Sequence, residues 1–461
     1  MNFCIKTGDN IYFTGDKWSL RADFSGDGDP GKRLLTIRSN NYPDTGETGD
    51  GAYGGLPIID IFYDCGRVTA DILFYGNGVP GMPVRLEAYT CETRAERICV
   101  YNTPNRVALY INGNLTDEDW PLGSVPFENS VCEVSAGNWE LRSETDEDNG
   151  RAHCENITGI PGGESGGVVT NIQNWRPEGH NTGVGDCMPF FHDGVFHLFY
   201  LFDRRGHKSK RGLGAHQWAH ISTVDLINWT RHPMAVAIDS QWEGSICTGS
   251  TVFHNGIYYA FYAVRMSDGS AARLTWASGS DCVAFTKSNR YFELGEPYDA
   301  QSARDPFVFF GADGTAHMFV TTSIKTEGGN MGCLAHLASS DLLCWTPLDP
   351  LVIRDSADQP ECPDYFRIGD LYYLIYSIRG TAGYYMSDYP FGPWRRPVDN
   401  VVIGEGCRVP KTAKFGDNRI IAAGFIVDPP GRGYAGRVYF NELIQKCDGT
   451  FDFVVPEEMD G

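Results

Sequence analysis

Three acidic residues stand at similar places in the chain, each just before an apolar segment that is predicted to form a strand: Asp186, Asp305 and Glu361. Glu361 lies between Pro360 and Pro363. A carboxylate fixed in this way is better suited to acid and base chemistry than to a place on a solvated surface. If the fold brings the three acids together, the pKa of at least one must rise, because like charges repel. In glycoside hydrolysis a protonated carboxyl can protonate the leaving oxygen, while an ionised carboxylate beside it attacks or stabilises the reacting carbon.

The chain repeats itself beyond residue 180. Five segments share an apolar entry, a turn with glycine and an aromatic strand, at intervals of roughly 50–60 residues, which is about the length of a four-stranded blade. They cover residues 189–200, 251–262, 306–320, 363–376 and 410–425. We therefore predict an all-β fold with a five-bladed β-propeller, in which the first strand of each blade lines the central channel. The three acids share one phase of the repeat and would face one funnel.

The first part of the chain has a different pattern. Residues 1–145 contain short alternating segments, and the segment 106–113 ends in Asn112-Gly113, a strong hairpin signal. We predict an N-terminal β-sandwich over residues 1–145, whose hairpin resembles those of lectin-like sandwiches; a structural sandwich that binds no ligand is the alternative. Residues 146–180 are predicted to be a glycine-rich linker or surface loop, and residues 181–461 to be the propeller.

Composition limits the partners. The formal net charge is −21, and no cluster of Lys and Arg stands out, so we expect no nucleic-acid partner. No apolar run approaches the ~20 residues that a membrane helix needs, and the N-terminus lacks an apolar signal core, so we expect no membrane partner either. A small, neutral glycoside or oligosaccharide substrate is compatible with this charge. The oligomeric state stays open.

The cysteines and histidines do not form the spacings of a metal site. The 14 cysteines are scattered singly without a Cys-x-x-Cys pair, which favours free thiols in a reducing cytoplasm. His197, His216 and His220 are expected to pack or to donate hydrogen bonds, because a zinc site needs three ligands in tetrahedral geometry. We therefore expect neither a metal nor a cofactor, and a cytoplasmic location.

Several motifs resemble glycoside hydrolase family 32, the invertase, inulinase and levanase family. They are Gly185-Asp186-Cys187-Met188-Pro189, the strand 194–200, Trp218-Ala219-His220, Arg304-Asp305-Pro306 and Glu361-Cys362-Pro363-Asp364, and together they span roughly residues 180–455. The resemblance implies a retaining fructosidase on a propeller of the clan shared with families 43 and 68. It also implies hydrolysis of a terminal β-fructofuranoside or a related furanoside.

The resemblance assigns roles to particular residues. Asp186 would be the nucleophile, Glu361 the general acid/base and Asp305 the stabiliser of the transition state. Five further residues would contact the substrate or shape the pocket: Arg304, Trp218, Trp242, Thr248 and Asp203. Thr248 falls where the family keeps a Phe-Ser-Gly-Ser segment.

Two departures from the family pattern bear on specificity. The family motif Trp-Met-Asn-Asp-Pro-Asn-Gly has an Asn before the nucleophile, where this chain has Gly185, and Leu201 stands where a Gln is expected. Each lost hydrogen-bond partner changes the discrimination between sugars by roughly 1–3 kcal/mol. The family also places its sandwich after the propeller. Three alternatives therefore stay open beside the leading retaining hydrolase: an inverting arabinosidase or xylosidase of the family 43 type, a fructosyltransferase, and a carbohydrate-binding protein without turnover.

Overall fold

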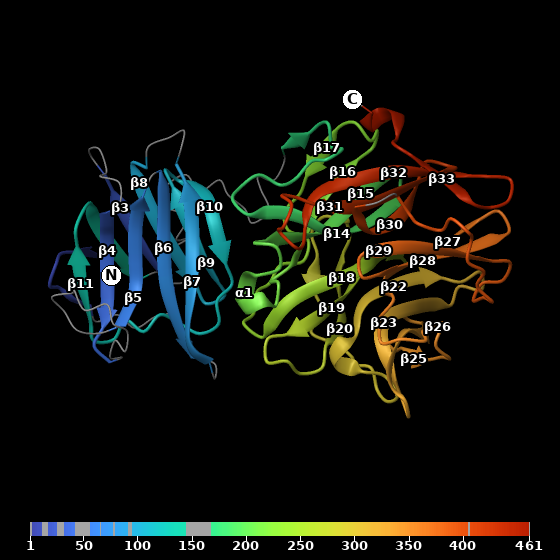
Figure 1. Ribbon diagram of the computed structural model, residues 1–461, viewed down its shortest axis with the longest axis horizontal. Coiled ribbons are helices and arrows are strands. Elements are labelled where there is room, and N and C mark those ends of the chain that lie inside the picture. Colours follow the sequence, from blue (N-terminus) through green and yellow to red (C-terminus); the bar gives the residue numbers. More distant parts are fainter. Residues whose placement is uncertain are drawn as a thin grey trace.

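The computed structural model is built almost entirely of β-strands, arranged in two bodies that lie side by side (Figure 1). It describes residues 2–11, 17–24, 32–41, 56–64, 66–76, 79–90, 95–143, 167–403 and 406–460. Within these ranges the helical elements are short: α1 (Ser209–Gly212) and two 3-10 turns, Ala300–Ser302 and Glu457–Met459. The prediction of an all-β fold is confirmed.

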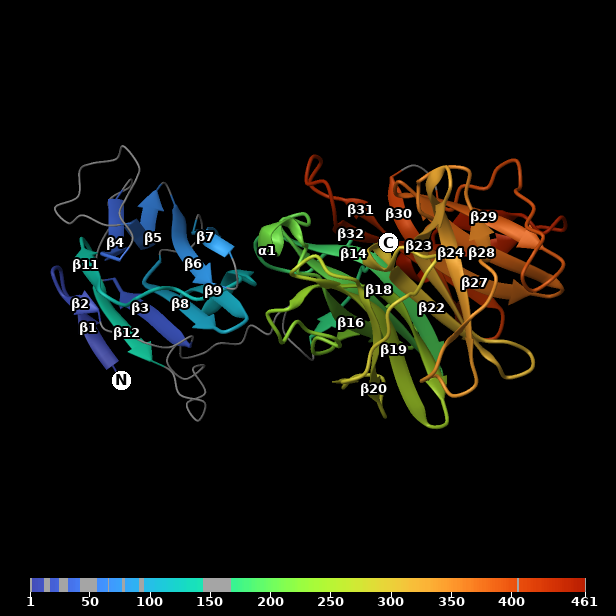
Figure 2. The same ribbon diagram turned by 90° about the horizontal axis from the view of Figure 1, so that it is seen from below.

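The N-terminal body consists of two six-stranded antiparallel sheets that face each other across one apolar core (Figure 2). The first sheet has the order β1 (Asn2–Ile5), β12 (Asn138–Ser143), β3 (Trp18–Asp23), β8 (Arg97–Thr103), β9 (Arg106–Ile111) and β10 (Asn114–Asp119). The second has the order β2 (Asn10–Ile11), β11 (Ser130–Val134), β4 (Lys32–Ser39), β5 (Leu56–Asp64), β6 (Arg67–Gly76) and β7 (Val79–Tyr89). This arrangement is a β-sandwich.

The β9–β10 hairpin shows how the sequence produces this body. Val107, Leu109 and Ile111 alternate along β9 and pack into the core between the sheets. The turn that follows has positive φ at both central residues, 52° at Asn112 and 86° at Gly113. A two-residue hairpin turn of the favoured type requires this left-handed conformation twice, which Asn and Gly adopt most readily. The predicted hairpin is therefore confirmed.

The C-terminal body contains five antiparallel blades. The first is β14 (Thr182–His192), β15 (Val195–Arg204), β16 (Gln217–Thr223), β17 (Trp229–Arg231) and β13 (Val168–Val169). The second is β18 (Glu243–His254), β19 (Ile257–Met266), β20 (Arg273–Gly279) and β21 (Thr286–Lys287), and the third is β22 (Arg304–Phe310), β23 (Ala316–Thr326), β24 (Gly329–Ser339), β25 (Thr346–Pro347) and β26 (Val352–Ile353). The fourth is β27 (Glu361–Ile368), β28 (Leu371–Ile378) and β29 (Thr381–Ser387), and the fifth is β30 (Cys407–Phe415), β31 (Arg419–Val427), β32 (Gly436–Gln445) and β33 (Phe451–Val454).

The five blades close into a ring. The innermost strands contact one another in the order β14, β18, β22, β27 and β30, and β30 contacts β14 again. A bridge between Val184 and Gly436 also joins the first blade to the last. The inner hairpins fall on the five repeated segments of the sequence, so the predicted five-bladed propeller is confirmed.

Each innermost strand has a break in its register near its start. The breaks fall between Val184 and Cys187, Ile246 and Gly249, Arg304 and Phe307, Glu361 and Asp364, and Arg408 and Lys411. A β-bulge leaves an extra residue unpaired and changes the direction of its side chain. At least one residue from each bulge lines the same pocket, among them Asp186, Thr248, Asp305, Cys362 and Val409. The bulges therefore place the chemistry at one end of the channel.

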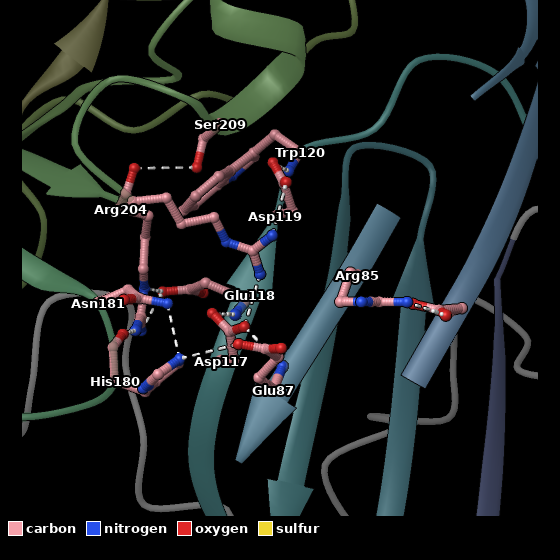
Figure 3. Close-up of polar contacts among 12 residues, drawn as sticks. Arg85, Glu87, Asp117, Glu118, Asp119, Trp120, His180, Asn181, Arg204 and Ser209 are labelled. Atoms are coloured by element: carbon pink, nitrogen blue, oxygen red, sulfur yellow. Dashed lines mark hydrogen bonds and ion pairs between the residues drawn. The ribbon is translucent and has the colours of Figure 1, made fainter. Parts of the chain in front are cut away.

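The sandwich and the propeller meet through three consecutive acids at the end of β10, residues 117–119 (Figure 3). Glu118 is fully buried and accepts hydrogen bonds from Arg106 of the sandwich at 2.6 Å and from Arg204 of the propeller at 2.9 Å. Burial alone raises the pKa of the Glu118 carboxyl, but the two guanidinium groups outweigh burial and hold this pKa below its usual range. The carboxylate is thus a charged link between the two bodies.

The neighbouring acids of this stretch add two further links. Asp117 accepts a hydrogen bond from Arg205 at 2.6 Å, and Asp119 accepts the backbone N–H of Lys210 at 3.0 Å. Most of the segment between the two bodies, residues 146–166, lies outside the described residues. From residue 167 onward the chain already packs on the propeller, because β13 pairs with β17 in the first blade.

The cysteines differ in one respect from the expectation of free thiols. Ten of the described cysteines are free, whereas Cys99 is disulfide-bonded. In the described part of the chain no helix is long and apolar enough to cross a lipid bilayer.

The link at Glu118 predicts a large loss of stability in the variant Glu118→Gln. The change leaves two buried guanidinium groups without their shared carboxylate, which lowers the free energy of unfolding by about 3 kcal/mol. Thermal unfolding followed by circular dichroism measures this loss. The matched control is Glu296→Gln, which removes an exposed partner of Lys325 and should leave the melting temperature unchanged. Equal melting temperatures for Glu118→Gln and the wild type would contradict the prediction.

Candidate active site

A pocket of about 460 Å³ lies at the bulged ends of the innermost strands, and all five blades contribute to it. The three predicted acids line this pocket: Asp186 from β14, Asp305 from β22 and Glu361 from β27. Thr248 from β18 and Tyr434, two residues before β32, belong to the same lining. The arrangement brings together acids that are far apart in the sequence, as the common phase of the repeats predicts.

Both oxygens of the Asp186 carboxylate are held by side-chain donors. Oδ2 accepts hydrogen bonds from the Thr248 hydroxyl at 2.6 Å and from the Cys362 thiol at 3.4 Å. Oδ1 accepts a hydrogen bond from the Tyr434 hydroxyl at 2.9 Å. Burial raises the pKa of the Cys362 thiol well above its usual value, so the thiol keeps its proton and donates. The three donors fix the orientation of the carboxylate.

Asp305 is the most deeply enclosed of the three acids, with 3% of its surface exposed. Its Oδ2 accepts the backbone N–H of Cys362 at 3.1 Å and lies 3.7 Å from Nε of Arg304. Burial raises the pKa of this carboxyl to about 6, and the charges of Asp186 and Glu361 act in the same direction. Arg304 and the Cys362 N–H oppose the rise. The sequence predicts a raised pKa among the three acids, and the structure places it at Asp305.

Glu361 is paired with Arg304. The guanidinium donates to Oε1 of Glu361 at 2.7 Å, and it also donates to the carbonyl of Ser302 at 3.0 Å and to the side chain of Gln359. The Glu361 side chain keeps 35% of its surface exposed, toward the pocket that it lines. Arg304 therefore contacts two of the three acids and sets the direction of Glu361.

A second buried cation lies further along the channel. Lys411 is 2% exposed, donates to the carbonyl of Gly249 at 2.8 Å and sits 4.9 Å from the ring of Phe307. Burial lowers the pKa of its ammonium group, and the carboxylate of Asp364 works against this shift. Lys411 thus lies on the channel side of the crowded carboxylates, and Arg304 lies on the pocket side.

Three residues that the sequence places at the substrate lie elsewhere. Trp218 is fully buried in the core of the propeller, where its Nε1–H donates to the carbonyl of Cys247 at 2.8 Å. Trp242 is 42% exposed outside the pocket, with the Arg273 guanidinium 4.9 Å from its ring. Neither tryptophan belongs to the pocket lining. The prediction that the two tryptophans form the pocket wall is therefore wrong, because Trp218 lies in the hydrophobic core and Trp242 faces solvent.

Asp203 lies behind the pocket wall. It is fully buried and accepts the backbone N–H groups of Gly206 and His207, both at 2.8 Å. It also contacts Nε2 of His216 at 3.0 Å and the guanidinium of Arg432 at 2.6 Å. Asp203 therefore does not line the pocket, although the sequence predicts it to do so. It contacts His207 and His216, which do line it.

The pocket also contains residues that the sequence analysis missed. They are cationic and aromatic side chains from both strands and loops: His207, His216, Arg265, Arg379, Arg408, Phe425 and Tyr434. None of them stands in a recognisable motif, and only the missing side chain at Gly185 indicates that a residue from elsewhere must fill the space beside Asp186. Among the described residues, no group of three or more His, Cys, Asp and Glu side chains is placed to hold a metal ion.

Comparison with known proteins identifies relatives of the propeller. Residues 187–404 match the model of the glycosyl hydrolases family 32 N-terminal domain. The sucrose-6-phosphate hydrolases of Escherichia coli and of Bacillus subtilis are each 29% identical, over 40% and 41% of this chain and 39% of their own length. A solved β-fructofuranosidase of Bombyx mori is 20% identical over 62% of this chain and 66% of that chain, with a TM-score of 0.49.

The chain covers less than half the length of these curated relatives, and the matched region is the part that carries Asp305, Glu361 and the inner strands of the first four blades. The resemblance of the propeller to glycoside hydrolase family 32 is therefore confirmed over residues 187–404.

Proposed function

We propose that the chain is a retaining glycoside hydrolase that removes a terminal β-fructofuranosyl or related furanosyl group. The observation that carries this proposal is the difference between the surroundings of three acids in one pocket. Asp186 is held by three side-chain donors, Asp305 is enclosed beside Arg304, and Glu361 is partly exposed. Relatives of the propeller that are named sucrose-6-phosphate hydrolase support the same reaction class.

In the proposed reaction the Asp186 carboxylate attacks the anomeric carbon while Glu361 transfers its proton to the leaving oxygen. The bond between the carbon and that oxygen breaks, and the sugar becomes an ester of Asp186. Glu361 then takes a proton from water as the water attacks the same carbon, which releases the sugar and regenerates Asp186. Asp305, ionised above pH 6, would stabilise the positive charge that develops on the ring.

The domain division is part of the proposal. The sandwich over residues 1–145 would support the catalytic propeller over residues 181–461, with the segment 146–180 between them. The substrate would be a small glycoside. A cytoplasmic location is supported by the ten free cysteines and opposed by the disulfide at Cys99.

A substrate with an anionic substituent is the more specific candidate. Besides Arg304, the pocket is lined by Arg265, Arg379 and Arg408, although the whole chain carries a net charge of −21. Guanidinium groups match phosphate and carboxylate groups by charge and by geometry. The names of the relatives point the same way, since these enzymes act on a phosphorylated disaccharide.

The assignment of roles predicts complete loss of hydrolysis in two variants. Asp186→Ala lacks the nucleophile and Glu361→Ala lacks the proton donor, so each should lower kcat by at least ~10³-fold on a furanoside substrate. Azide should restore turnover of Asp186→Ala and give a glycosyl azide, because the azide ion replaces the missing nucleophile. Retained turnover in either variant would contradict the assignment. Release of a product with the inverted anomeric configuration, read by NMR, would favour the inverting alternative.

The raised pKa of Asp305 predicts a trade between stability and activity. In the unfolded chain this carboxyl ionises near its usual pKa of 3.8, whereas in the folded chain it ionises at about 6. Folding therefore loses stability as pH rises from 4 to 6, and the loss is complete above 6. At pH 7–8 the free energy of unfolding of Asp305→Asn should exceed that of the wild type by about 3 kcal/mol, so the variant should unfold at a higher temperature. Near pH 3.5 the two proteins should unfold at the same temperature. The activity of the variant should fall sharply at every pH.

The cationic lining predicts a preference for phosphorylated substrate. The ratio of kcat/KM between sucrose-6-phosphate and sucrose should exceed ~10 in the wild type and fall several-fold in Arg408→Gln, because a charged hydrogen bond is lost. Arg367→Gln, which changes an exposed arginine paired with Asp370 away from the pocket, is the matched control and should keep the wild-type ratio. Equal kcat/KM values for the two substrates would end this more specific proposal.

A further inference from the structure

Gly185 and Tyr434 occupy one space beside the Asp186 carboxylate. A Cβ atom added at Gly185 would lie 2.5 Å from the hydroxyl oxygen of Tyr434 and 2.9 Å from Cε1 of its ring. Real Cβ atoms do not approach other atoms this closely, and Gly185 has no positive φ that would demand glycine. The glycine is therefore explained by the space that the tyrosine takes. The Asn that family 32 has at this position could not be accommodated together with Tyr434.

The Tyr434 hydroxyl makes two hydrogen bonds to the same residue. It donates to Oδ1 of Asp186 at 2.9 Å and accepts the backbone N–H of Asp186 at 3.2 Å. Burial and the negative charge of Asp186 raise the pKa of the Tyr434 hydroxyl well above its usual value, so the hydroxyl keeps the one proton that it donates. A single side chain from the last blade thus fixes both the backbone and the carboxylate of a residue in the first blade.

The ring of Tyr434 is held in turn by aromatic neighbours. His216 stacks on it, with 4.9 Å between ring centroids and 25° between ring planes, and Phe425 meets it edge-on at 5.2 Å. Nε2 of His216 lies 3.0 Å from the buried Asp203 carboxylate. The hydroxyl therefore has little freedom to leave Asp186, which is the condition for a group that orients another.

We propose that Tyr434 is the positioning residue of the Asp186 nucleophile and that glycine is required at position 185 because a larger residue would collide with Tyr434. This inference rests on the proposed function, in which Asp186 attacks the sugar. Where family 32 has an amide side chain that could contact the sugar, this chain has the ring of Tyr434, and Leu201 and Phe425 line the same pocket wall without a hydrogen-bonding side chain. The wall would then contribute less to the preference for one sugar hydroxyl pattern over another.

The first test is Tyr434→Phe in the full chain, which keeps the ring and removes only the hydroxyl. The expected result is a fall in kcat of roughly 10–100-fold with KM changed less than about threefold, since a hydrogen bond to a charged group is lost. The acid limb of the pH–rate profile should move to higher pH, because the ionised nucleophile loses a donor. A purely structural role would leave that limb unmoved. Wild-type kcat and pH profile in Tyr434→Phe would overturn the inference while leaving the proposed function intact.

The second test measures the coupling between the two residues. Gly185→Ala should lower the melting temperature and kcat/KM, the latter by at least ~10-fold, in the wild type, and should have less than about a threefold further effect on kcat/KM in the Tyr434→Ala background. Gly295→Ala is the matched control, because Gly295 has no atom within 4 Å of an added Cβ and no positive φ. If Gly185→Ala lowers the melting temperature equally in the wild type and in the Tyr434→Ala background, the two residues do not share one space. This comparison of melting temperatures needs no substrate.

Trapping separates positioning from direct attack. A slow furanoside that accumulates a covalent intermediate should label Asp186, as read by mass spectrometry of peptides from the wild-type protein. A label on Tyr434 would overturn the inference, because the tyrosine would then be the nucleophile and Asp186 its base. Failure of the wild type to cleave any furanoside would remove the proposed function and this inference together.

Discussion

The crowding of three carboxylates at one end of the propeller channel is the constraint on which the rest of the site depends. Asp186, Asp305 and Glu361 come from three blades, and the closure of five blades leaves them no way to separate. Their repulsion must be offset by cations and donors at fixed places. Arg304 contacts two of the acids and Lys411 lies behind them. Burial is the main cause of the raised pKa of Asp305, and the remaining repulsion from Asp186 and Glu361 adds to it.

The bulges solve the geometric side of the same problem. A regular strand would turn successive side chains to opposite faces, so only alternate residues would reach the axis. The break in each innermost strand lets one extra residue point into the pocket without loss of the hairpin that follows. Asp305 and Cys362 have φ values of 54° and 51°, which are uncommon for residues with a side chain, and both lie within such breaks. The two residues with this strained backbone conformation both line the pocket.

The sequence predicts those parts of the molecule that repeat. The five hairpins recur along the chain with one phase, and the acids share that phase, so the propeller and the meeting of Asp186, Asp305 and Glu361 follow from one pattern. Residues that reach the pocket from loops carry no such signal. Tyr434 lies 248 residues after Asp186, and its place can be inferred only from the side chain that Gly185 lacks. Trp218 and Trp242 show the opposite error, since their type suggests a sugar-binding wall while their neighbours make one a core residue and leave the other exposed.

The link at residues 117–119 bears on how this protein could have arisen. Arg204, 3% exposed, directly follows the Asp203 carboxylate that holds His207 and His216, and it directs its guanidinium to Glu118 of the sandwich. A propeller deprived of its sandwich would leave Arg204 without its carboxylate partner, at the end of the strand β15 that supports one wall of the pocket. The two domains are therefore poor candidates for independent shuffling, and a lineage that carries its sandwich at the N-terminus must keep both sides of this charge pair or rebuild both.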